Sequence, residues 1–151
     1  MSPTRLAHHP DWWRVRDVMT THVVRVVPTA TYDEVVDLLL AHGVSGAPVT
    51  DASGHLLGVV TEADLVRREA EHAGDEGTTG APDGGEETAA TLMTRSVVTA
   101  SPDDDLPTTA RKLLESGHRR LPVVADDGRL VGVVSRRDLL APAWDYPAPG
   151  D

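Results

Sequence analysis

The sequence predicts an α/β fold of the α+β type, built from two copies of a β-α-β-β-α unit. The main observation is a stretch that occurs twice, because residues 56–65 read LLGVVTEADL and residues 130–139 read LVGVVSRRDL. Laying residues 17–66 over residues 91–140 without a gap gives 17 identities in 50 positions. A self-match of this length indicates a tandem repeat of one structural unit.

The first half of repeat 1 predicts a strand followed by a helix. Residues 23–27 read VVRVV, which is rich in β-branched residues and ends at Pro28. Thr31 and Glu34 have the spacing of a capping box, and apolar residues then recur at helical spacing. Gly43 is expected to end this helix.

The second half of repeat 1 predicts a hairpin followed by a second helix. Two short apolar strands, 47–50 and 56–60, flank the turn sequence DASG at 51–54. The second helix is expected to open at Thr61. Repeat 2 has the same order, with a strand at 97–101, a helix capped by Asp105 and closed by Gly117, and strands at 121–125 and 130–134 joined by the turn DDGR.

Two adjacent tryptophans precede repeat 1. Leaving both Trp12 and Trp13 in water is costly, so two interpretations are open. They cover the core of their own domain, or they lie at a subunit contact, where tryptophan is enriched.

Composition bounds the class of protein. The chain has 151 residues and no Cys, which is enough for a compact core and excludes a disulfide framework. The apolar runs are far shorter than a membrane span, and the first residues lack the pattern of a signal peptide. We therefore expect a cytoplasmic protein with no membrane partner.

Charge is distributed unevenly along this acidic chain. The net charge is −10, and repeat 1 (17–66) holds seven acidic residues with Arg25 as its only base. This balance argues against nucleic acid as a partner. Repeat 2 could still bind a small anion, because it concentrates most of the basic side chains. These are Arg95, Arg111, Lys112, Arg119, Arg120, Arg129, Arg136 and Arg137.

The repeat openings DVMT (17–20) and LMT (92–94), the Pro-Val strands and the closing GVVTEAD and GVVSRRD resemble tandem CBS domains, the Bateman module, of the small stand-alone bacterial type. The resemblance implies two repeats packed about a pseudo-twofold axis, with clefts between them, and a homodimer of such modules. It also implies adenosine ligands, namely AMP, ADP, ATP or S-adenosylmethionine, with no required cofactor. The expected layout is an N-terminal segment (1–14), CBS repeat 1 (15–70), a flexible acidic linker (71–90), CBS repeat 2 (91–141) and a C-terminal tail (142–151).

The twin closing motifs supply candidate ligand-binding residues. Asp64 and Asp138 stand where the family places a carboxylate that accepts from both ribose hydroxyls. Thr61 and Ser135, three residues earlier at a helix start, offer a hydroxyl to ribose or phosphate. The same pattern also fits a plain helix cap with an acid in the first turn, and the motif alone leaves both interpretations open.

Charge predicts that the two clefts differ. By the resemblance, Asp64 faces the residues before the Pro-Val strand of the other repeat, which are Arg119 and Arg120, with Arg137 nearby. Guanidinium groups bind phosphate in bidentate fashion. We therefore expect one phosphate-accepting nucleotide site, with the Ser135 and Asp138 cleft empty or holding an uncharged adenosine moiety. The alternative is a solvated basic face that balances the acidic repeat.

Three classes of function remain in competition. The first is a regulatory module that senses an adenine nucleotide or related adenosyl ligand and signals to an unidentified protein partner. The second is a dimerisation or protein-interaction platform without a ligand, since a fold does not fix a function. The third is an enzyme, which we do not expect because the sequence has no nucleophile elbow, P-loop or metal-ligand spacing.

Overall fold

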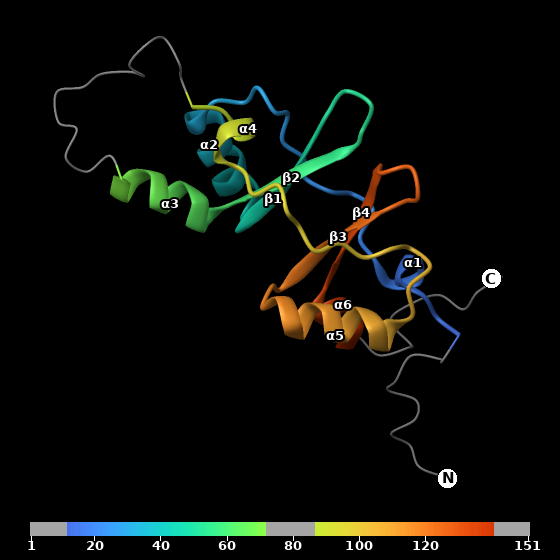
Figure 1. Ribbon diagram of the computed structural model, residues 1–151. Helices are drawn as coiled ribbons and strands as arrows, with labels where there is room; N and C mark the ends of the chain where they lie inside the picture. Colours follow the sequence, from blue (N-terminus) through green and yellow to red (C-terminus); the bar gives the residue numbers. More distant parts are fainter. Residues whose placement is uncertain (1–11, 72–86, 141–151) are drawn as a thin grey trace, which may run out of the picture. The chain divides into compact units, whose positions relative to one another are not determined.

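The computed structural model describes residues 12–71 and 87–140, which form two compact units. The first-repeat unit runs from Val24 to Val97 and contains α2 (Tyr32–His42), β1 (Gly46–Thr50), β2 (Leu56–Thr61), α3 (Glu62–Glu71) and α4 (Ala89–Leu92). The second-repeat unit contains the described residues up to Val23 and from Val98 to Leu140, with α1 (Val15–Val18), α5 (Leu106–Ser116), β3 (Arg120–Val124), β4 (Leu130–Ser135) and α6 (Arg136–Leu140) (Figure 1). The mixed helix and strand content confirms the predicted α+β class.

Parts of the predicted layout lie outside the described residues. These are most of the N-terminal segment, residues 72–86 of the expected flexible linker, and the C-terminal tail with its two aromatic residues, Trp144 and Tyr146.

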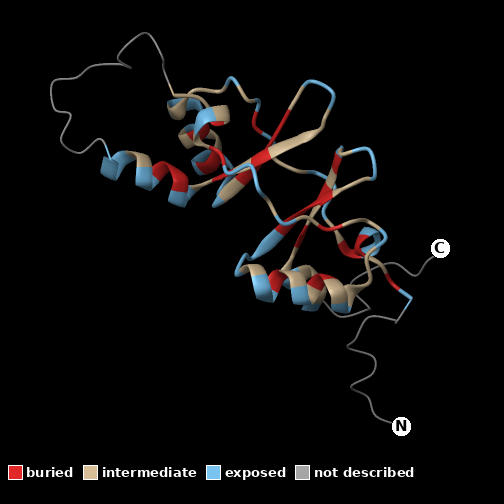
Figure 2. Cartoon of the chain, viewed as in Figure 1, coloured by how far each residue is buried: buried red, intermediate tan, exposed pale blue. Residues whose placement is uncertain are grey.

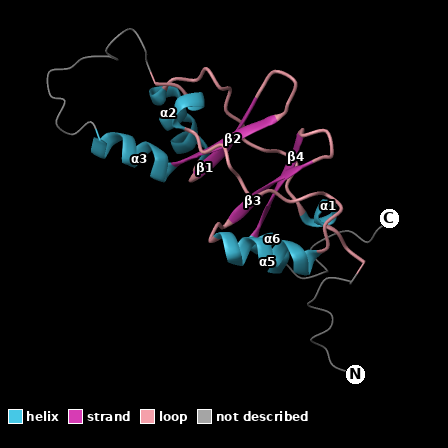
Figure 3. Ribbon diagram, viewed as in Figure 1, coloured by secondary structure: helices cyan, strands magenta, loops and turns pink. Residues whose placement is uncertain are grey.

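Each unit is built around one antiparallel hairpin, drawn in magenta in Figure 3. In the first-repeat unit β1 pairs with β2, with Val49 opposite Gly58. In the second-repeat unit β3 pairs with β4 in the equivalent register, with Val123 opposite Gly132. All four predicted hairpin strands are therefore present, each within one residue of its expected bounds.

The predicted strands at 23–27 and 97–101 are wrong, because each is a single bridge. Val26 donates to Pro48 O at 2.9 Å and accepts from Thr50 N at 3.0 Å. The ladder cannot extend because Pro28 has no N–H for Thr50 O and Pro48 has none for the carbonyl of Val24. In the other unit, Ala100 forms the equivalent single bridge to Val123 of β3. Pro102 and Pro122 occupy the positions of Pro28 and Pro48 and lack the same two N–H groups.

The outer edge of each hairpin is covered by a segment from the other repeat of the sequence. Thr94, from repeat 2, exchanges two hydrogen bonds with Val59 of β2, at 2.9 and 3.0 Å. Thr20, from repeat 1, does the same with Val133 of β4, at 2.9 Å in both directions. In Figure 1 the blue α1 accordingly lies with the orange and red elements, and the yellow α4 with the teal and green ones. The repeats have thus exchanged their opening segments.

The exchanged segments complete the two hydrophobic cores, shown in red in Figure 2. The core of the second-repeat unit combines residues of the exchanged segment with those of the hairpin and α5, namely Trp13, Val15, Val18, Ala100, Leu113, Leu121, Val123 and Val134. In the first-repeat unit, Ala89 and Met93 take the equivalent part beside Val35, Val49 and Val60. Trp13 is 4% exposed and Trp12 is 56% exposed, so one tryptophan covers the core and the other lies at the surface.

The long helices begin and end where the sequence predicted. Thr31 and Glu34 form the reciprocal capping box of α2, with Glu34 N donating to Thr31 Oγ1 at 3.2 Å. Asp105 Oδ1 caps α5 by accepting from Thr108 N at 2.7 Å. Both helices end at a glycine in the left-handed conformation, Gly43 with φ 63° and Gly117 with φ 75°, which a side chain would strain.

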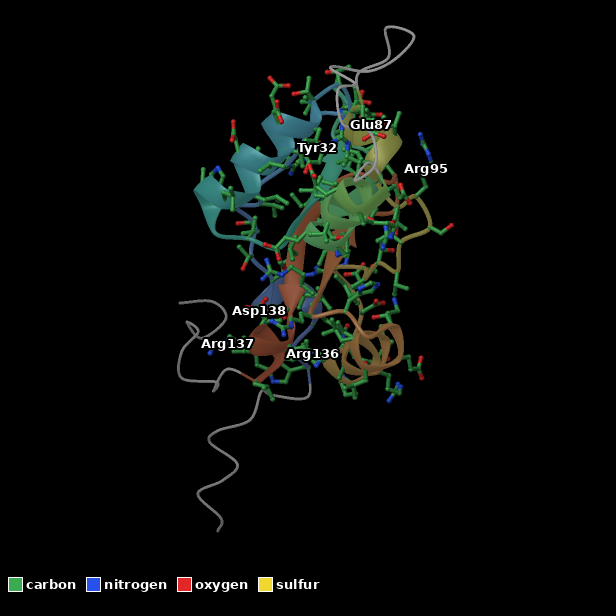
Figure 4. All side chains as sticks on the ribbon, turned by 90° about the vertical axis from the view of Figure 1, so that its left-hand side faces the viewer. Tyr32, Glu87, Arg95, Arg136, Arg137 and Asp138 are labelled. Atoms are coloured by element: carbon green, nitrogen blue, oxygen red, sulfur yellow. The ribbon has the colours of Figure 1, made fainter. Side chains whose placement is uncertain are left out.

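A polar network ties α3 to the beginnings of α2 and α4. Arg68 pairs with Glu87, which directly precedes the α4 segment, and its guanidinium lies 4.2 Å from the ring centroid of Tyr32. Tyr32 OH donates to Glu69 Oε1 at 3.1 Å. Burial and the Glu69 carboxylate together raise the pKa of Tyr32. Figure 4 labels Tyr32 and Glu87 in this part of the first-repeat unit. The network therefore joins α3 to the start of α2 and to the segment that leads into α4.

Aspartates at turns and caps make the stability of the fold sensitive to acid. The Thr108 N–H lowers the pKa of Asp105, and the His55 N–H lowers that of Asp51. Burial raises the pKa of Asp104, but the Ser101 N–H and the Lys112 ammonium outweigh it, so the net shift is downward. Carboxyls with lowered pKa stabilise the fold above about pH 4, the ordinary aspartate pKa, and this stabilisation is lost as pH falls through the lowered values.

We therefore expect the thermal unfolding midpoint to fall as the pH drops below about 4. In Asp105→Asn the cap is kept without a titrating group, so the fall should be shallower. Following ellipticity against temperature at several pH values would check this. An Asp105→Asn variant with the same slope as the parent chain would contradict the assignment.

Candidate functional site

The two closing motifs occupy equivalent positions in the two units. Thr61 is the last residue of β2 and directly precedes α3, while Ser135 is the last residue of β4 and directly precedes α6. Each is held by the hairpin register, with Thr61 opposite Gly46 and Ser135 opposite Arg120. Each motif therefore begins where a buried strand ends, and its acid falls in the first turn of the following helix.

In the first-repeat unit, Thr61 and Asp64 hydrogen-bond each other reciprocally. Asp64 Oδ2 accepts from Thr61 N at 2.8 Å and from Thr61 Oγ1 at 3.0 Å. Asp64 N donates back to Thr61 Oγ1 at 3.3 Å. Asp64 is 7% exposed, so these bonds satisfy most of a buried carboxylate. The cap interpretation of this motif is thus correct as a description of the local geometry.

The remaining oxygen of Asp64 faces a cation. Arg67 Nη1 donates to Asp64 Oδ1 at 3.0 Å, and the Arg67 side chain is 61% exposed. The pair thus joins an exposed guanidinium to a buried carboxylate. Sequence reasoning missed Arg67, although its i,i+3 spacing from Asp64 was a usable signal.

The second-repeat unit repeats the cap with Ser135 and Asp138. Ser135 N donates to Asp138 Oδ2 at 2.8 Å, and Asp138 N donates to Ser135 Oγ at 3.1 Å. Asp138 is half-buried where Asp64 is buried. The two carboxylates are therefore equivalent in backbone position and different in surroundings.

Four arginines, which we call the arginine cluster, gather at this end of the β3–β4 hairpin. Arg120 begins β3 and is paired in register with Ser135 of β4. Arg119 O accepts from Arg136 N at 3.0 Å, which joins the two chain segments at the hairpin end. Figure 4 shows Arg136 and Arg137 beside Asp138 at the start of α6. The members of the cluster are Arg119, Arg120, Arg136 and Arg137.

The arginine cluster lacks acidic partners. All four side chains are exposed, and none forms an ion pair with a carboxylate within residues 12–71 and 87–140. Other basic side chains do have such partners, as in the pairs Arg16–Asp103, Arg68–Glu87 and Lys112–Asp104. Asp138, half-buried and engaged with Ser135 N, is the acid nearest in sequence. Arginines at one hairpin end offer planar, charged donors that suit an anion.

The equivalent end of the β1–β2 hairpin has no such charge. With the offset of 74, the positions of the four arginines are taken by Ser45, Gly46, Glu62 and Ala63. Glu62 N donates to Ser45 O at 2.8 Å, so the backbone geometry is the same. The two hairpin ends therefore have the same backbone geometry and different side chains, and the side chains produce the charge asymmetry predicted from the sequence.

The structure brings together some of the predicted site residues. Arg119, Arg120, Ser135, Arg137 and Asp138 lie at one hairpin end of the second-repeat unit. Thr61 and Asp64 belong to the first-repeat unit, so the site that combines all of them stays a prediction. Arg136 was not among the predicted site residues, although the dipeptide RR in SRRD was available as a signal.

Metal-binding side chains do not cluster in the described part of the chain. It contains no group of three or more His, Asp or Glu residues placed to hold a metal ion. It also contains no helix that is long and apolar enough to cross a membrane.

Comparison with known families gives two matches within this chain. The profile of the CBS domain matches residues 15–71 and again residues 89–143. The CBS domain-containing protein YhcV of Bacillus subtilis is 32% identical, over 83% of this chain and 81% of its own length. An uncharacterized protein of Methanocaldococcus jannaschii is 31% identical over 87% of this chain, which spans 44% of that protein.

Solved structures show the same fold. The crystal structure of CBSX2 in complex with AMP has a TM-score of 0.69 and 31% identity, covering 84% of this chain and 93% of that one. CBSX2 is a chloroplastic protein of Arabidopsis thaliana. The CBS domain pair of protein MJ0100, in complex with 5′-methylthioadenosine and S-adenosyl-L-methionine, has a TM-score of 0.68 and 25% identity, covering 83% of this chain and 91% of that one.

Proposed function

Because this chain belongs to the CBS-domain family, we propose that it is a regulatory module that binds an adenosine ligand and acts as a sensor, not as a catalyst. The ligand class is an adenine nucleotide or S-adenosylmethionine. It would be bound as a signal and released unchanged, so no cofactor is required. The proposed compartment is the cytoplasm, where such ligands are available.

The arginine cluster is the observation that carries this proposal. Four exposed arginines stand at one hairpin end, and none of them pairs with a carboxylate of residues 12–71 and 87–140. Guanidinium offers planar, paired donors that match phosphate oxygens. The four equivalent positions in the first-repeat unit hold no basic residue, so the cluster is not a general feature of the repeat.

The adenosine part of the proposal is supported by the relatives and by the twin carboxylates. CBSX2 binds AMP, and the CBS pair of MJ0100 binds 5′-methylthioadenosine and S-adenosyl-L-methionine. In this chain Asp64 is already oriented by hydrogen bonds from Thr61, and its Oδ1 accepts a hydrogen bond from the exposed side chain of Arg67. We propose that Asp64 accepts from ribose hydroxyls while Arg119, Arg120 and Arg137 hold the phosphates, and that Ser135 and Asp138 serve an uncharged adenosine moiety.

Sensing would work by differential affinity. A ligand that binds one arrangement of the repeats more tightly shifts the population toward that arrangement. We propose that the module acts as a homodimer and that a separate protein reads the shift.

One observation favours a second candidate function, a dimerisation or protein-interaction platform without a ligand. Both Thr61–Asp64 and Ser135–Asp138 satisfy each other as helix caps, which gives the motifs a structural use on their own. A ligand-free platform would account for the helix caps, but it would not account for the arginine cluster.

A thermal-shift experiment separates the two functions. A ligand that binds only the folded chain stabilises it by about 2.7 kcal/mol at one hundred times its dissociation constant. For a domain of this size we expect AMP, ATP or S-adenosylmethionine to raise the unfolding midpoint by about 5–10 °C at that saturation.

The matched variants are Arg119→Ala with Arg120→Ala, and Arg129→Ala as the control. Arg129 is exposed and pairs with Asp127 in the β3–β4 turn, away from the cluster end. The double variant should lose most of the shift given by ATP, while Arg129→Ala keeps it. No shift with any of the three ligands would reject the sensor and leave the platform.

A further inference from the structure

The carboxylate of Asp64 already accepts most of the hydrogen bonds that it can accept. An ionised carboxylate has about four lone-pair positions, shared equally by its two oxygens. Asp64 Oδ2 accepts from Thr61 N at 2.8 Å and from Thr61 Oγ1 at 3.0 Å, which fills its share. Asp64 Oδ1 accepts from Arg67 Nη1 at 3.0 Å. Among the residues that the structure describes, these contacts leave one lone-pair position, on Oδ1.

The ribose that the proposed function assigns to Asp64 carries two neighbouring hydroxyls. Each hydroxyl donates one hydrogen bond, so a carboxylate that accepts from both needs two lone-pair positions. A sugar with one hydroxyl at this place can use the remaining position on Oδ1 and leave every present bond intact. A sugar with both hydroxyls is accepted in full only when one of the present donors leaves.

Arg67 differs from the two donors of Thr61 in its freedom to move. Its side chain is 61% exposed, so its guanidinium can turn into water on a long, flexible stem. Thr61 N belongs to the last residue of β2 and cannot turn without the strand. Thr61 Oγ1 also accepts from Asp64 N at 3.3 Å, which fixes the hydroxyl within the motif. The arginine is therefore the donor whose departure disturbs the fold least.

We propose that Arg67 determines the sugar specificity of this site, because its guanidinium and the second ribose hydroxyl compete for Oδ1 of Asp64. The inference rests on the proposed function, in which Asp64 accepts from ribose. A ribonucleotide exchanges the Arg67 bond for a hydroxyl bond, so its second hydroxyl adds little net affinity. A 2′-deoxyribonucleotide keeps the Arg67 bond. The chain therefore discriminates weakly between the two sugars.

The second-repeat unit has no arginine at the equivalent position. The offset of 74 places Ala141 where repeat 1 has Arg67, and alanine has no side-chain donor. The rest of the motif is the same, since Ser135 N donates to Asp138 Oδ2 and Asp138 N donates to Ser135 Oγ. The competing arginine is thus a property of the Asp64 motif and not of the repeat.

The preference for ATP over 2′-deoxy-ATP tests this competition in the full chain. The measured quantity is the ratio of the dissociation constant of 2′-deoxy-ATP to that of ATP, both from calorimetric titration. Because both ligands carry the same phosphates, the general effect of losing a positive charge cancels in this ratio. We expect Arg67→Met, which removes the donor and keeps the length of the side chain, to raise the ratio on the order of tenfold.

The matched control is Arg129→Met, which should keep the ratio of the parent chain. The Arg129 side chain is 58% exposed and pairs with an aspartate, Asp127, in the β3–β4 turn. The control therefore removes an arginine of similar exposure from an ion pair that is not part of the site.

The outcomes separate this inference from the proposed function. If neither the parent chain nor Arg67→Met binds ATP, the proposed function is rejected, and the inference with it. If ATP binds and the ratio in Arg67→Met equals that of the parent chain, the competition alone is rejected. A ratio that rises in Thr61→Val and not in Arg67→Met would identify the Thr61 hydroxyl as the donor that leaves, which overturns the proposal. Thermal unfolding should confirm that each variant is folded.

Discussion

Trp13→Ala is expected to lower the free energy of unfolding by about 4 kcal/mol, within the range found for buried tryptophan. Trp13 is 4% exposed and packs in the core of the second-repeat unit with residues of α5 and both hairpin strands. It belongs to the segment contributed by the other repeat, so the substitution also weakens the attachment of that segment. Denaturant unfolding followed by ellipticity gives the change directly.

Trp12 provides the matched control. It is 56% exposed and meets the Trp13 ring edge-on, with centroids 6.1 Å apart. Trp12→Ala therefore removes one ring contact and little buried area, and it should cost about 1 kcal/mol. Equal losses in the two variants would contradict the assignment of Trp13 to the core.

Gly58→Ala is expected to cost about 3 kcal/mol, because the added methyl group has no room. A Cβ at this position would lie 2.5 Å from Thr94 O and 2.8 Å from Met93 Sδ. The methionine side chain can move, but Thr94 O is held by the hydrogen bond from Val59 N. The substitution must therefore break the bridge that holds the exchanged segment on β2.

The control for Gly58→Ala is Gly43→Ala. Gly43 ends α2 in the left-handed conformation, and a Cβ there would meet no atom within 4 Å. It should cost about 1 kcal/mol of backbone strain and leave packing unchanged. If shortening the side chain in Met93→Ala fully rescued Gly58→Ala, the backbone clash would not be the cause.

The hairpins and helix caps could be predicted because their signals are local. The four hairpin strands are short apolar runs beside turn sequences, and the caps of α2 and α5 lie three residues from their partners. The strands predicted at 23–27 and 97–101 failed for a reason that the sequence also contained. Pro28 and Pro48 remove the N–H groups that a longer parallel ladder needs, and Pro102 and Pro122 do the same in the other repeat.

The exchange of opening segments could not be predicted from the repeat alone. An internal match shows which residues are equivalent, but it does not show whether Met19 packs on its own repeat or on the other. The structure answers this with a close approach, since Met93 Sδ would lie 2.8 Å from a Cβ on Gly58 and Met19 Sδ 2.8 Å from one on Gly132. The alignment of the two repeats would be the same whether each methionine packed on its own repeat or on the other one.

Part of the candidate site could be predicted because its signals are also local in the sequence. The sequence identified the twin carboxylates and the basic character of repeat 2. It did not identify Arg67 as the ion-pair partner of Asp64, or Arg136 as the fourth member of the arginine cluster. Both follow from spacing once the helix starts are fixed at Glu62 and Arg136, and those starts depend on where the strands end.

Calorimetric titration of the full chain with ATP and with adenosine tests the central claim most directly. The account predicts one ATP site per chain, with an affinity that falls roughly tenfold or more in the Arg119→Ala, Arg120→Ala double variant, since charged hydrogen bonds are worth about 1.5–3 kcal/mol each. Adenosine has no phosphate, so its affinity should be the same in both proteins. An absence of binding heat with ATP, or equal losses of ATP and adenosine binding in the double variant, would contradict the account.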